Sequence, residues 1–488
     1  MFNPEVFRTS SKELGITVKK DQDLSEWYTQ VVTKAQLADY SSAKGFMVLM
    51  PYGYSIWEKI KEDFDKKIKA IGHKNAYFPL LIPERLLKTE TEHFAGFTPE
   101  VFWVTHSGDT ELAEKLAVRP TSETIIYESY SKWVKSWRDL PILINVWNSV
   151  VRAEITSTRP FLRTTEFLWQ EGHTVHETER EAEEEVMTIL GIYTKLVEDE
   201  LAIPILVGKK TEREKFKGAV YTTTMEAMMP DGKALQMGTS HHLGQKFSVP
   251  FEIKYLGKDE KEHYGWTTSW GLSWRVIGAA ILSHGDDRGL ILPPRIAPTQ
   301  VVIIPIFYKE TDQKDISDEV KHLSSQLEQI GIRTLIDDRA QYTPGWKYHE
   351  WEMKGVPLRV EIGPKDVQAK QVTVVRRDTR EKIAINRSDA NDRISKILNE
   401  IQNQLFDRAK KSLDGLTTIA ADMQSFKKVL EEKGGFIKAF LSDDSCEEKI
   451  KIETGATVRV VPMKAAKKGK CVYCGADNSI EVYFARSY

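Results

Sequence analysis

The spacing of apolar residues predicts helices over three stretches of the first 290 residues of this chain. Apolar positions recur every three to four residues over 24–41, 55–71 and 179–200, which is the period of a helix with one buried face. The helix over 55–71 carries an apolar stripe of Ile56, Ile60, Phe64 and Ile68. It is flanked by the segments LMPYGYSIW and NAYFPLLIP, so the expected order is strand, long helix, strand.

The pattern changes after LPPRIAPTQ, residues 292–300, whose three prolines suit an extended linker. Beyond it, short apolar segments alternate with stretches of helical spacing. The segments expected to be strands are 301–306, 333–336, 357–363, 371–377 and 382–386. Strands that alternate with helices predict a small α/β domain with a mixed sheet. From about 388 to 432 the pattern is helical again.

The composition is that of a globular protein with two to four domains. Hydrophobic residues make up 41% and charged residues 29% of the 488 residues. The net charge of −2 means that any contact with RNA would depend on local basic patches. No apolar run approaches the ~20 residues of a membrane span, and the N-terminus lacks a signal-peptide core, so no membrane association is expected. Three cysteines, an odd number clustered after residue 445, favour a reducing cytoplasm over a disulfide framework.

Charged and aromatic side chains gather in a hairpin formed by the runs 143–151 and 166–170 and the polar loop between them. Arg152 and Glu154 are two residues apart at the end of the first run, so in a strand both side chains lie on one face. Arg163 lies in the returning loop. The second run continues the alternation with Phe167, Trp169, Glu171 and His173. Guanidinium groups, rings and carboxylates on one face are what a bound nucleotide requires, and merely solvated charges are the alternative.

A second group, Thr121-Ser122-Glu123, follows Pro120 and precedes an apolar run with helical spacing. A Thr or Ser at the start of a helix, with a Glu in the first turn, would cap that helix. The same residues offer a carboxylate and a hydroxyl to a secondary ammonium, which has two N–H donors. Both roles can coexist, because a helix start exposes its cap at the mouth of a pocket.

Two more segments carry candidate chemistry. In LQMGTSHHLGQKFS, residues 235–248, the adjacent His241 and His242 are not expected in the core, and in a strand they point to opposite faces and chelate a metal poorly. Downstream, Gly271 precedes Arg275, which opens an apolar helix. An arginine at a glycine-led helix start suits a phosphate group.

These motifs together resemble the class II aminoacyl-tRNA synthetases. The order Arg-x-Glu, loop, Arg, Phe in the hairpin resembles their motif 2. The segment RPFLRTTEFLWQEGHT is similar to the corresponding sequence of the prolyl branch of the class. The order strand, helix, strand around 55–71 resembles motif 1, and the segment around Arg275 resembles motif 3. PGWKYHEWEMKGVPLRVEIGPKD resembles the anticodon-binding domain that the prolyl, threonyl, histidyl and glycyl enzymes share. The FARSY ending, and the lack of room for a bacterial editing insertion between Gly172 and Gly271, resemble the archaeal and eukaryotic type.

The resemblance implies an α+β and α/β multidomain fold. It places a class II catalytic domain with an antiparallel sheet over 1–297, an α/β anticodon-binding domain over 298–400, and a helical linker with a small α+β C-terminal domain over 401–488. It implies a homodimer, because motif 1 builds the dimer interface in the family. The implied enzyme is a proline–tRNA ligase of the cytoplasm, which attaches L-proline to tRNA(Pro) with ATP through a prolyl-adenylate and releases pyrophosphate and AMP.

The resemblance also assigns site residues. The proline site would consist of Thr121, Glu123, Arg152, Trp169, His173 and His241. The ATP site would consist of Arg152, Glu154, Arg163, Thr164, Phe167, Gln236, Thr239, Ser273 and Arg275. Arg152 and Arg275 would be catalytic, and Gln236 with Glu171 would hold Mg²⁺. A carboxylate is already a competent nucleophile, so catalysis would consist of positioning and charge stabilisation, without a general base.

The C-terminal segment contains a candidate zinc site. Cys471 and Cys474 form half of a zinc knuckle, and Cys446 lies upstream, whereas a closed structural site has four ligands. The family has two cysteines near the position of Cys446, and here Leu441 or Ser442 stands where the second would be. Bound Zn²⁺, with a carboxylate such as Asp443 as a fourth ligand, and an empty, eroded site remain open alternatives. The resemblance further implies that Tyr488 folds back near the active site, with its carboxylate paired to a cation.

Two other functions remain open. One is a class II synthetase for threonine, glycine or histidine; a threonyl enzyme would need a cysteine in its catalytic domain, and no cysteine precedes Cys446. The other is a non-enzymatic paralogue that binds or regulates. Retention of Arg152, Arg163 and Arg275 argues against it.

Overall fold

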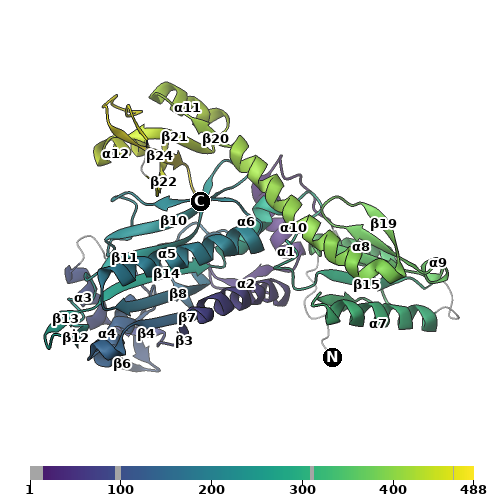
Figure 1. Ribbon diagram of the computed structural model, residues 1–488, viewed down its shortest axis with the longest axis horizontal. Coiled ribbons are helices and arrows are strands. Elements are labelled where there is room, and N and C mark those ends of the chain that lie inside the picture. Colours follow the sequence, from purple (N-terminus) through teal and green to yellow (C-terminus); the bar gives the residue numbers. More distant parts are fainter. Residues whose placement is uncertain (1–14, 94–99, 308–312, 465–466) are drawn as a thin grey trace. The chain divides into compact units, whose positions relative to one another are not determined.

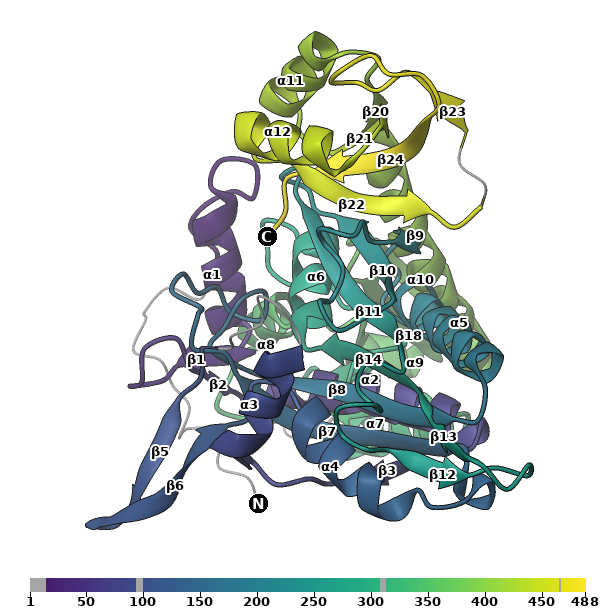
Figure 2. The same cartoon turned by 90° about the vertical axis from the view of Figure 1, so that its left-hand side faces the viewer.

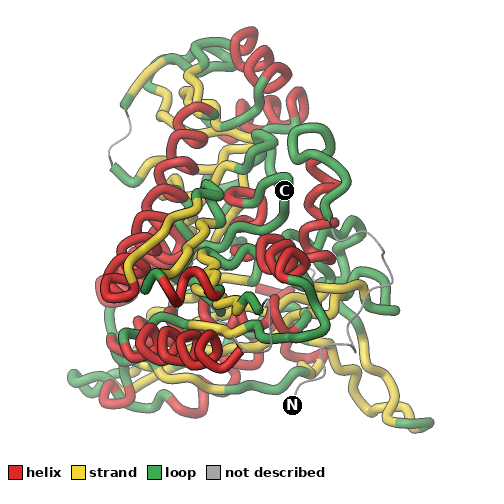
Figure 3. The backbone as a smooth tube through the Cα atoms, turned by 90° about the vertical axis from the view of Figure 1, so that its right-hand side faces the viewer, coloured by secondary structure: helices red, strands yellow, loops and turns green. Residues whose placement is uncertain are grey.

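The computed structural model describes residues 15–93, 100–307, 313–464 and 467–488, which divide into two compact units. One unit contains the chain up to Asp39, Val48–Lys59 and Ala280–Leu405, and the other contains Tyr40–Met47, Ile60–Ala279 and Phe406–Tyr488. Both units contain helices and strands, and Figure 3 shows the two kinds of element mixed in the described chain. The predicted mixed, multidomain fold class is confirmed.

The second unit is built on a 12-stranded sheet in the order β20-β21-β24-β22-β9-β10-β11-β14-β8-β7-β3, with β23 beside β24 (Figure 2). The first part of the chain supplies β3 (Lys74–Ala76), β7 (Ile142–Val151), β8 (Glu166–His176), β9 (Ile205–Lys209), β10 (Tyr221–Met228), β11 (Ala234–Gly244) and β14 (Trp266–Ser273). The C-terminal segment supplies β20 (Thr417–Ile419), β21 (Phe436–Leu441), β22 (Thr457–Pro462), β23 (Lys468–Gly469) and β24 (Ser479–Ala485). Antiparallel pairing of β22 with β9 joins the two groups of strands into one sheet.

The same unit contains smaller strands and several helices. Its other strands are β4 (Leu81–Pro83), β5 (Trp103–Ser107), β6 (Thr110–Val118), β12 (Lys254–Leu256) and β13 (Glu262–Tyr264). Its helices are α3 (Glu84–His93), α4 (Glu123–Trp133), the short turn η2 (Trp137–Asp139), α5 (Glu179–Lys195) with a π-helical turn η3 (Leu196–Glu200), α11 (Met423–Glu432) and α12 (Asp444–Thr454).

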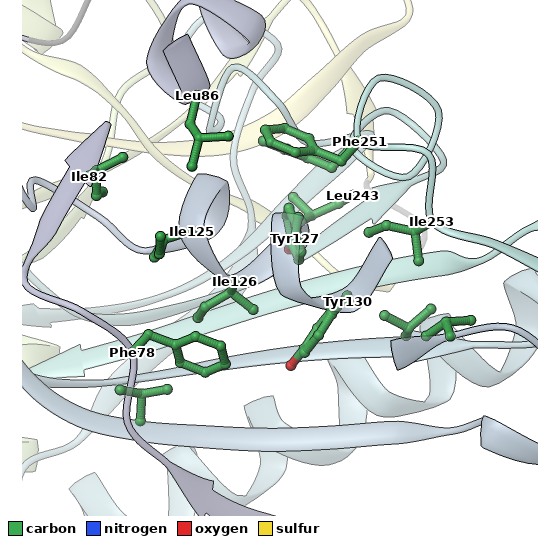
Figure 4. Close-up of a cluster of buried hydrophobic side chains, with 14 of the residues drawn as sticks. Phe78, Ile82, Leu86, Ile125, Ile126, Tyr127, Tyr130, Leu243, Phe251 and Ile253 are labelled. Atoms are coloured by element: carbon green, nitrogen blue, oxygen red, sulfur yellow. The ribbon is translucent and has the colours of Figure 1, made fainter. Parts of the chain in front are cut away.

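Helices bury both faces of the central part of the sheet. On one face α5 packs across β11 and β14 (Figure 1). Beside it, the ring of Phe64 stacks on Tyr193 at 5.0 Å and meets Trp270 edge-on. On the other face, α4 contributes Ile126, Tyr127 and Tyr130 to an apolar cluster that also contains Phe78, Ile82, Leu86, Leu243, Phe251 and Ile253 (Figure 4). Packing on both faces fixes the strands that carry the candidate site.

The first unit contains a five-stranded mixed sheet in the order β16-β15-β17-β18-β19. The strands are β15 (Val301–Pro305), β16 (Thr334–Ile336), β17 (Leu358–Ile362), β18 (Gln371–Arg376) and β19 (Lys382–Asn386), and the helices are α1 (Leu24–Lys34), α7 (Gln313–Gln329), α8 (Pro344–Met353), α9 (Pro364–Gln368) and the turn η5 (Arg387–Asp389). β15 is parallel to β16 and β17, and the remaining pairs are antiparallel. The predicted α/β domain with a mixed sheet is therefore confirmed.

Five elements have bounds that reach across the division between the units. They are β1 (Ala38–Tyr40), β2 (Met47–Leu49), α2 (Pro51–Ala70), α6 (Arg275–His284) and α10 (Ala390–Gly415). The predicted order of strand, long helix and strand around 55–71 is confirmed by β2, α2 and β3.

Two predicted helices were too long. The helix predicted over 24–41 ends at Lys34, because Gln36 has a left-handed backbone with φ of 57° and β1 follows. The helical pattern over 388–432 is broken after Gly415, where β20 pairs with β21 before α11 begins. In both places a short strand follows the helix: β1 pairs with β2 in a two-stranded sheet, and β20 pairs with β21. The local apolar spacing does not report such pairing.

Candidate active site

A cavity of about 290 Å³ opens over the strands β8, β10, β11 and β14. Twelve of the predicted site residues line it, namely Thr121, Glu123, Arg152, Phe167, Trp169, Glu171, His173, Gln236, Thr239, His241, Ser273 and Arg275. On β8 the predicted alternation holds, since Phe167, Trp169, Glu171 and His173 all face this cavity. The described structure thus brings together residues that are up to 154 positions apart in the sequence.

One end of the cavity is acidic. Ligand atoms of Glu123, Glu171 and His173 lie within 4.8 Å of one another, and all three residues are buried. His173 Nε2 lies 3.1 Å from Glu171 Oε2. Burial opposes ionisation of Glu171, but its bonds to His173, Ser122 and Asn148 hold the pKa of this carboxyl below its ordinary value. Burial likewise opposes protonation of His173, and Glu171 and Glu123 together raise the pKa of its imidazole. This end can therefore bind a cationic ammonium group.

The segment Thr121-Ser122-Glu123 lies at this acidic end. Helix α4 begins at Glu123, and Ser122 occupies the N-cap position without a side-chain cap hydrogen bond. Instead, the Ser122 hydroxyl donates to Glu171, and the Thr121 hydroxyl donates to Glu123. The alternative in which the Ser122 hydroxyl caps the helix is therefore wrong, because this hydroxyl accepts no hydrogen bond from a backbone N–H of the first turn and instead contacts the Glu171 carboxylate.

His241 is uncharged and lies beside the acidic end. Thr222 Oγ1 lies 2.8 Å from its Nδ1, and Thr239 Oγ1 lies 3.0 Å from its Nε2. Burial, with a smaller contribution from His173, lowers the pKa of His241 to about 3. Its neighbour His242 points to the opposite face of the sheet, as predicted, and stacks on Tyr221 at 5.2 Å. The expectation that neither histidine belongs to the core was wrong for His242, which is fully buried.

The other end of the cavity is cationic. The guanidinium of Arg152 lies 5.3 Å above the ring of Phe167. Arg275 is the first residue of α6 and donates to the backbone oxygens of Leu162, at 3.1 Å, and Gln236, at 3.4 Å. Burial first, and then Arg152, lower the pKa of Arg275 to about 10. Two close guanidinium groups are suited to binding phosphate groups.

Three predicted residues lie away from the main cavity. Arg163 and Thr164 line a smaller cavity of about 40 Å³, which shares Arg152, Phe167, Ser273 and Arg275 with the main one. Glu154 is exposed and lines neither cavity. Strand β7 ends at Val151, so Arg152 and Glu154 follow it in a turn, and the expectation that a strand aligns them on one face was wrong. The backbone leaves the sheet there because the polar loop turns back toward β8.

Several lining residues were not expected from the sequence, namely Lys210, Glu214, Lys215, Phe216 and Thr222. Most belong to the charged segment after β9, which resembles a solvated loop in composition. Asn148 was also missed, although its amide donates to Glu171 at 2.8 Å and its oxygen accepts from Trp169 at 2.6 Å. The one available signal for Asn148 was its position two residues from both Val146 and Val150 on β7, which places the three side chains on one face of the strand.

The three cysteines meet in the C-terminal segment. Their sulfur atoms lie within 4.8 Å of one another. The hydroxyl of Ser442 lies 3.3, 3.4 and 3.5 Å from the sulfurs of Cys446, Cys471 and Cys474. Asp443 instead caps helix α12, where its carboxylate accepts from the backbone N–H of Cys446 at 2.9 Å. Three thiols thus lie close enough together to bind one metal ion, one ligand short of the four of a closed structural zinc site.

The end of the chain is held against the start of β11 and the loop between β7 and β8 in the same unit. The Tyr488 hydroxyl donates to Asp231 at 2.8 Å, and its ring lies 5.6 Å from the guanidinium of Arg159 in the loop between β7 and β8. The backbone of Ala234, at the start of β11, bonds to Arg486 and Tyr488. The prediction that this tail is ordered is confirmed, and the pairing of its carboxylate with a cation stays a prediction.

Comparison with known proteins agrees with this geometry. Residues 102–284 match the tRNA synthetase class II core domain (G, H, P, S and T), and residues 300–397 match the anticodon binding domain. The fold and the site therefore define a class II aminoacyl-tRNA synthetase. Residues 423–488 match the C-terminal domain of prolyl-tRNA synthetase.

Full-length relatives make the assignment specific. The proline–tRNA ligase of Cenarchaeum symbiosum is 54% identical over 98% of this chain and 100% of its own length. That of Natranaerobius thermophilus is 51% identical over 96% of this chain and 97% of its own length. The crystal structure of prolyl-tRNA synthetase from Cryptosporidium parvum, complexed with halofuginone and AMPPNP, has a TM-score of 0.92 and 43% identity, covering 97% of this chain and 100% of that one. The chain belongs to the prolyl-tRNA synthetase family, and its activity is the aminoacylation of tRNA with proline.

Among the described residues, no helix has the length and apolar character needed to cross a membrane.

Proposed function

We propose that the acidic end of the cavity binds L-proline. The secondary ammonium of proline has two N–H donors, and Glu123 and Thr121 can accept a hydrogen bond from each. The paired charges of Glu171 and His173 lie at the bottom of this end of the cavity. Trp169 and the neutral imidazole of His241 form walls against which an apolar ring can pack. The observation that carries the proposal is the convergence of these buried acceptors beside an uncharged histidine.

The cationic end is the proposed ATP site. Arg152, Arg275 and Arg163 would hold the phosphates, Phe167 the adenine ring, and Thr164, Gln236, Thr239, Ser273 and Glu154 the remaining contacts. The AMPPNP-bound relative supports the use of ATP here. Glu154 would have to move inward from its exposed position when the nucleotide binds.

The chemistry follows from this arrangement of charge. The carboxylate of proline would attack the α-phosphorus of ATP, forming the prolyl-adenylate and releasing pyrophosphate. Arg152 lines both the main and the smaller cavity, and it would stabilise the charge that develops on the α-phosphate. In the second step the prolyl group would move to the terminal ribose of tRNA(Pro), with release of AMP.

Two metal ions belong to the proposal. Mg²⁺ would neutralise the phosphates and bind through the side chain of Gln236, which lines the cavity. For Glu171 the metal role would compete with its three protein partners, Ser122, Asn148 and His173. Zn²⁺ fits the C-terminal cluster, because Cys446, Cys471 and Cys474 supply three soft thiolates and Ser442 supplies a fourth donor.

We further propose the domain division 1–297, 298–400 and 401–488, a cytoplasmic location, in which free cysteines persist, and a homodimer. The dimer is inferred from the motif 1 segment, whose apolar stripe is buried within the chain, as Ile60, Phe64 and Ile68 are at most 1% exposed. The proposed interface is the adjoining segment AYFPLLIP, in which Tyr77 and Leu80 follow the edge strand β3 and are 72% and 41% exposed.

Amino-acid-dependent ATP–pyrophosphate exchange tests these proposals together. A panel of proline, threonine, glycine, histidine and alanine should give exchange with proline at much lower concentration than with any other. Exchange driven better by threonine, glycine or histidine would overturn the assignment of the acidic end to proline. Absence of exchange with every amino acid would instead favour a non-enzymatic role.

A further inference from the structure

A fully buried carboxylate, Glu226, lies at the centre of a group of charges that the proposed chemistry does not use. Glu226 is on β10 and is 0% exposed. It accepts a hydrogen bond from the ammonium of Lys210 at 2.6 Å and from the guanidinium of Arg459 at 3.0–3.1 Å. Lys210 and Arg459 are themselves only 8% and 7% exposed. Two buried cations therefore share one buried carboxylate, and the group carries a net charge of +1.

Arg459 belongs to the C-terminal segment, 233 residues away from Glu226 in the sequence. It lies on β22, whose last residues pair with Lys209 and Gly208 of β9. A side chain at position 208 would collide with the backbone oxygen of Val461, so glycine permits this close approach. Arg459 also donates to Ser487, one residue before Tyr488. The guanidinium thus connects the sheet, the C-terminal strand and the terminal tail.

This charged group adjoins the nucleotide end of the cavity. Lys210 lines the cavity directly, although Arg459 and Glu226 do not. Glu226 is paired across strands with Gln236, and directly paired residues have side chains on the same face. The backbone oxygen of Gln236 in turn accepts from Arg275. Displacement of Glu226 would therefore disturb both a cavity-lining cation and the strand residue that orients Arg275.

We infer that Arg459 is a positioning residue for the nucleotide half of the active site, supplied by the C-terminal segment. Its bidentate contact fixes Glu226, and through Glu226 it fixes Lys210 and the Gln236 strand that holds Arg275. It also leaves the wall of the cavity with an excess positive charge, which favours triphosphate and pyrophosphate. This inference rests on the proposed ATP site, and it gives the C-terminal segment a direct part in adenylate formation.

The test compares Arg459→Met with Arg213→Met in the full-length protein. Arg213 pairs with Glu448 at 3.4 Å and joins the same two parts of the unit, but on the surface and outside the residues lining the cavity. We expect Arg459→Met to raise KM for ATP and for pyrophosphate roughly tenfold while KM for proline stays within about twofold. Arg213→Met should leave all three values unchanged. Assays should be run well below the Tm of each variant, so that loss of folded protein does not enter.

A double variant, Arg459→Met with Glu226→Gln, separates positioning from simple neutralisation of a buried charge. If Tm recovers and KM for ATP stays high, the positioning role is supported. If both recover to the wild-type values, Arg459 serves only to neutralise Glu226 and the inference is overturned. Equal changes in the KM values for ATP and proline in Arg459→Met would also overturn it. Should Arg459→Met fold poorly, the double variant and Arg459→Lys provide the same readouts, with Arg459→Lys expected to restore part of the ATP affinity.

Failure of this inference is distinguishable from failure of the proposed function. If the wild-type protein shows no proline-dependent exchange, the proposed sites are wrong. If the wild-type protein exchanges normally and the Arg459 variants do not separate ATP from proline, only the role of Arg459 is wrong.

Discussion

The hydroxyl of Ser122 donates to the carboxylate of Glu171 on strand β8, although Ser122 stands at the N-cap of helix α4. A serine at this position usually caps its own helix. Here it gives up that bond and orients a carboxylate in the floor of the cavity. The start of α4 is thereby tied to the sheet, and Glu123, the first residue of the helix, is held at the acidic end.

Replacing Glu123 should weaken the binding of proline selectively. We expect Glu123→Gln to raise KM for proline at least tenfold and to leave KM for ATP within about twofold, because loss of a buried charged contact typically costs ~2–5 kcal/mol. Glu128→Gln, on the same helix α4 but paired with Lys132 and Arg85 at the surface, is the matched control. Pyrophosphate exchange at varied proline and ATP measures both constants. If KM for proline changed less than twofold, Glu123 would be assigned to the start of the helix alone.

Replacing each of the two arginines of the cationic end should affect a different part of the reaction, adenylate formation for one and binding of ATP and pyrophosphate for the other. Arg152→Ala should slow adenylate formation by roughly 10²–10³-fold, since single contacts to a transition state contribute about 3–4 kcal/mol. Arg275→Ala should mainly raise KM for ATP and pyrophosphate. It should also cost ~1–2 kcal/mol of stability, because two backbone oxygens lose their donor. Single-turnover kinetics with thermal melts would check both, and a large drop in the Tm of Arg152→Ala would point to a structural role.

Dimerisation should depend on the exposed residues after β3. We expect the wild-type protein to be a dimer in light scattering, and Leu80→Asp combined with Tyr77→Ser to shift it toward a monomer with reduced activity. Ile419→Asp, which alters an equally exposed apolar residue of the same unit, should leave the dimer intact. A wild-type monomer that is stable and active at nanomolar concentration would contradict the proposal.

His241 should destabilise the protein as the pH falls. Burial lowers its pKa to about 3 in the folded state, whereas an unfolded histidine has a pKa of ~6.5. Between these values the unfolded chain binds the proton and the folded chain does not, so this contribution is complete above pH 6.5. It is lost at up to ~1.4 kcal/mol per pH unit below it. Urea unfolding at pH 7.5, 6.0 and 5.0 should therefore show His241→Gln gaining relative to wild type at the lower pH. A constant difference between the two proteins across this range would refute the assignment.

The C-terminal cluster should bind zinc, and Ser442 should limit its affinity. Ser442→Cys should complete a four-cysteine site and bind Zn²⁺ more tightly, while Ser442→Ala should bind it more weakly than wild type. Competition with a chromophoric chelator measures these affinities, and chelation should lower the Tm of the wild-type protein. Metal analysis that finds no zinc in the purified wild-type protein would leave the cluster as free cysteines.

Local patterns in the sequence were sufficient for the elements with strong periodicity. Strand β17, helix α5 and the alternation on β8 each follow from the spacing of their own residues. In α5, for example, Val186, Ile189 and Leu190 recur at helical spacing, which can be recognised without knowing their partners. The resemblance to a family supplied most of the cavity residues. By contrast, the contacts of Ser122 with Glu171 and of Arg459 with Glu226 join positions 49 and 233 residues apart. A single sequence contains no local signal for such pairs, because each partner alone looks like an ordinary polar residue.

The pairing of β22 with β9 has a consequence for the order in which the protein can mature. Until residues 457–462 have left the ribosome, strand β9 remains an open edge with unpaired backbone groups, and Glu226 lacks one of its two cations. A chain lacking its last 35 residues would therefore have an unpaired sheet edge at β9 that is prone to aggregation. Its Glu226 would also have only one of its two cationic partners. We expect such a nascent chain to depend on chaperones, and its catalytic pocket to become competent only once synthesis is nearly complete.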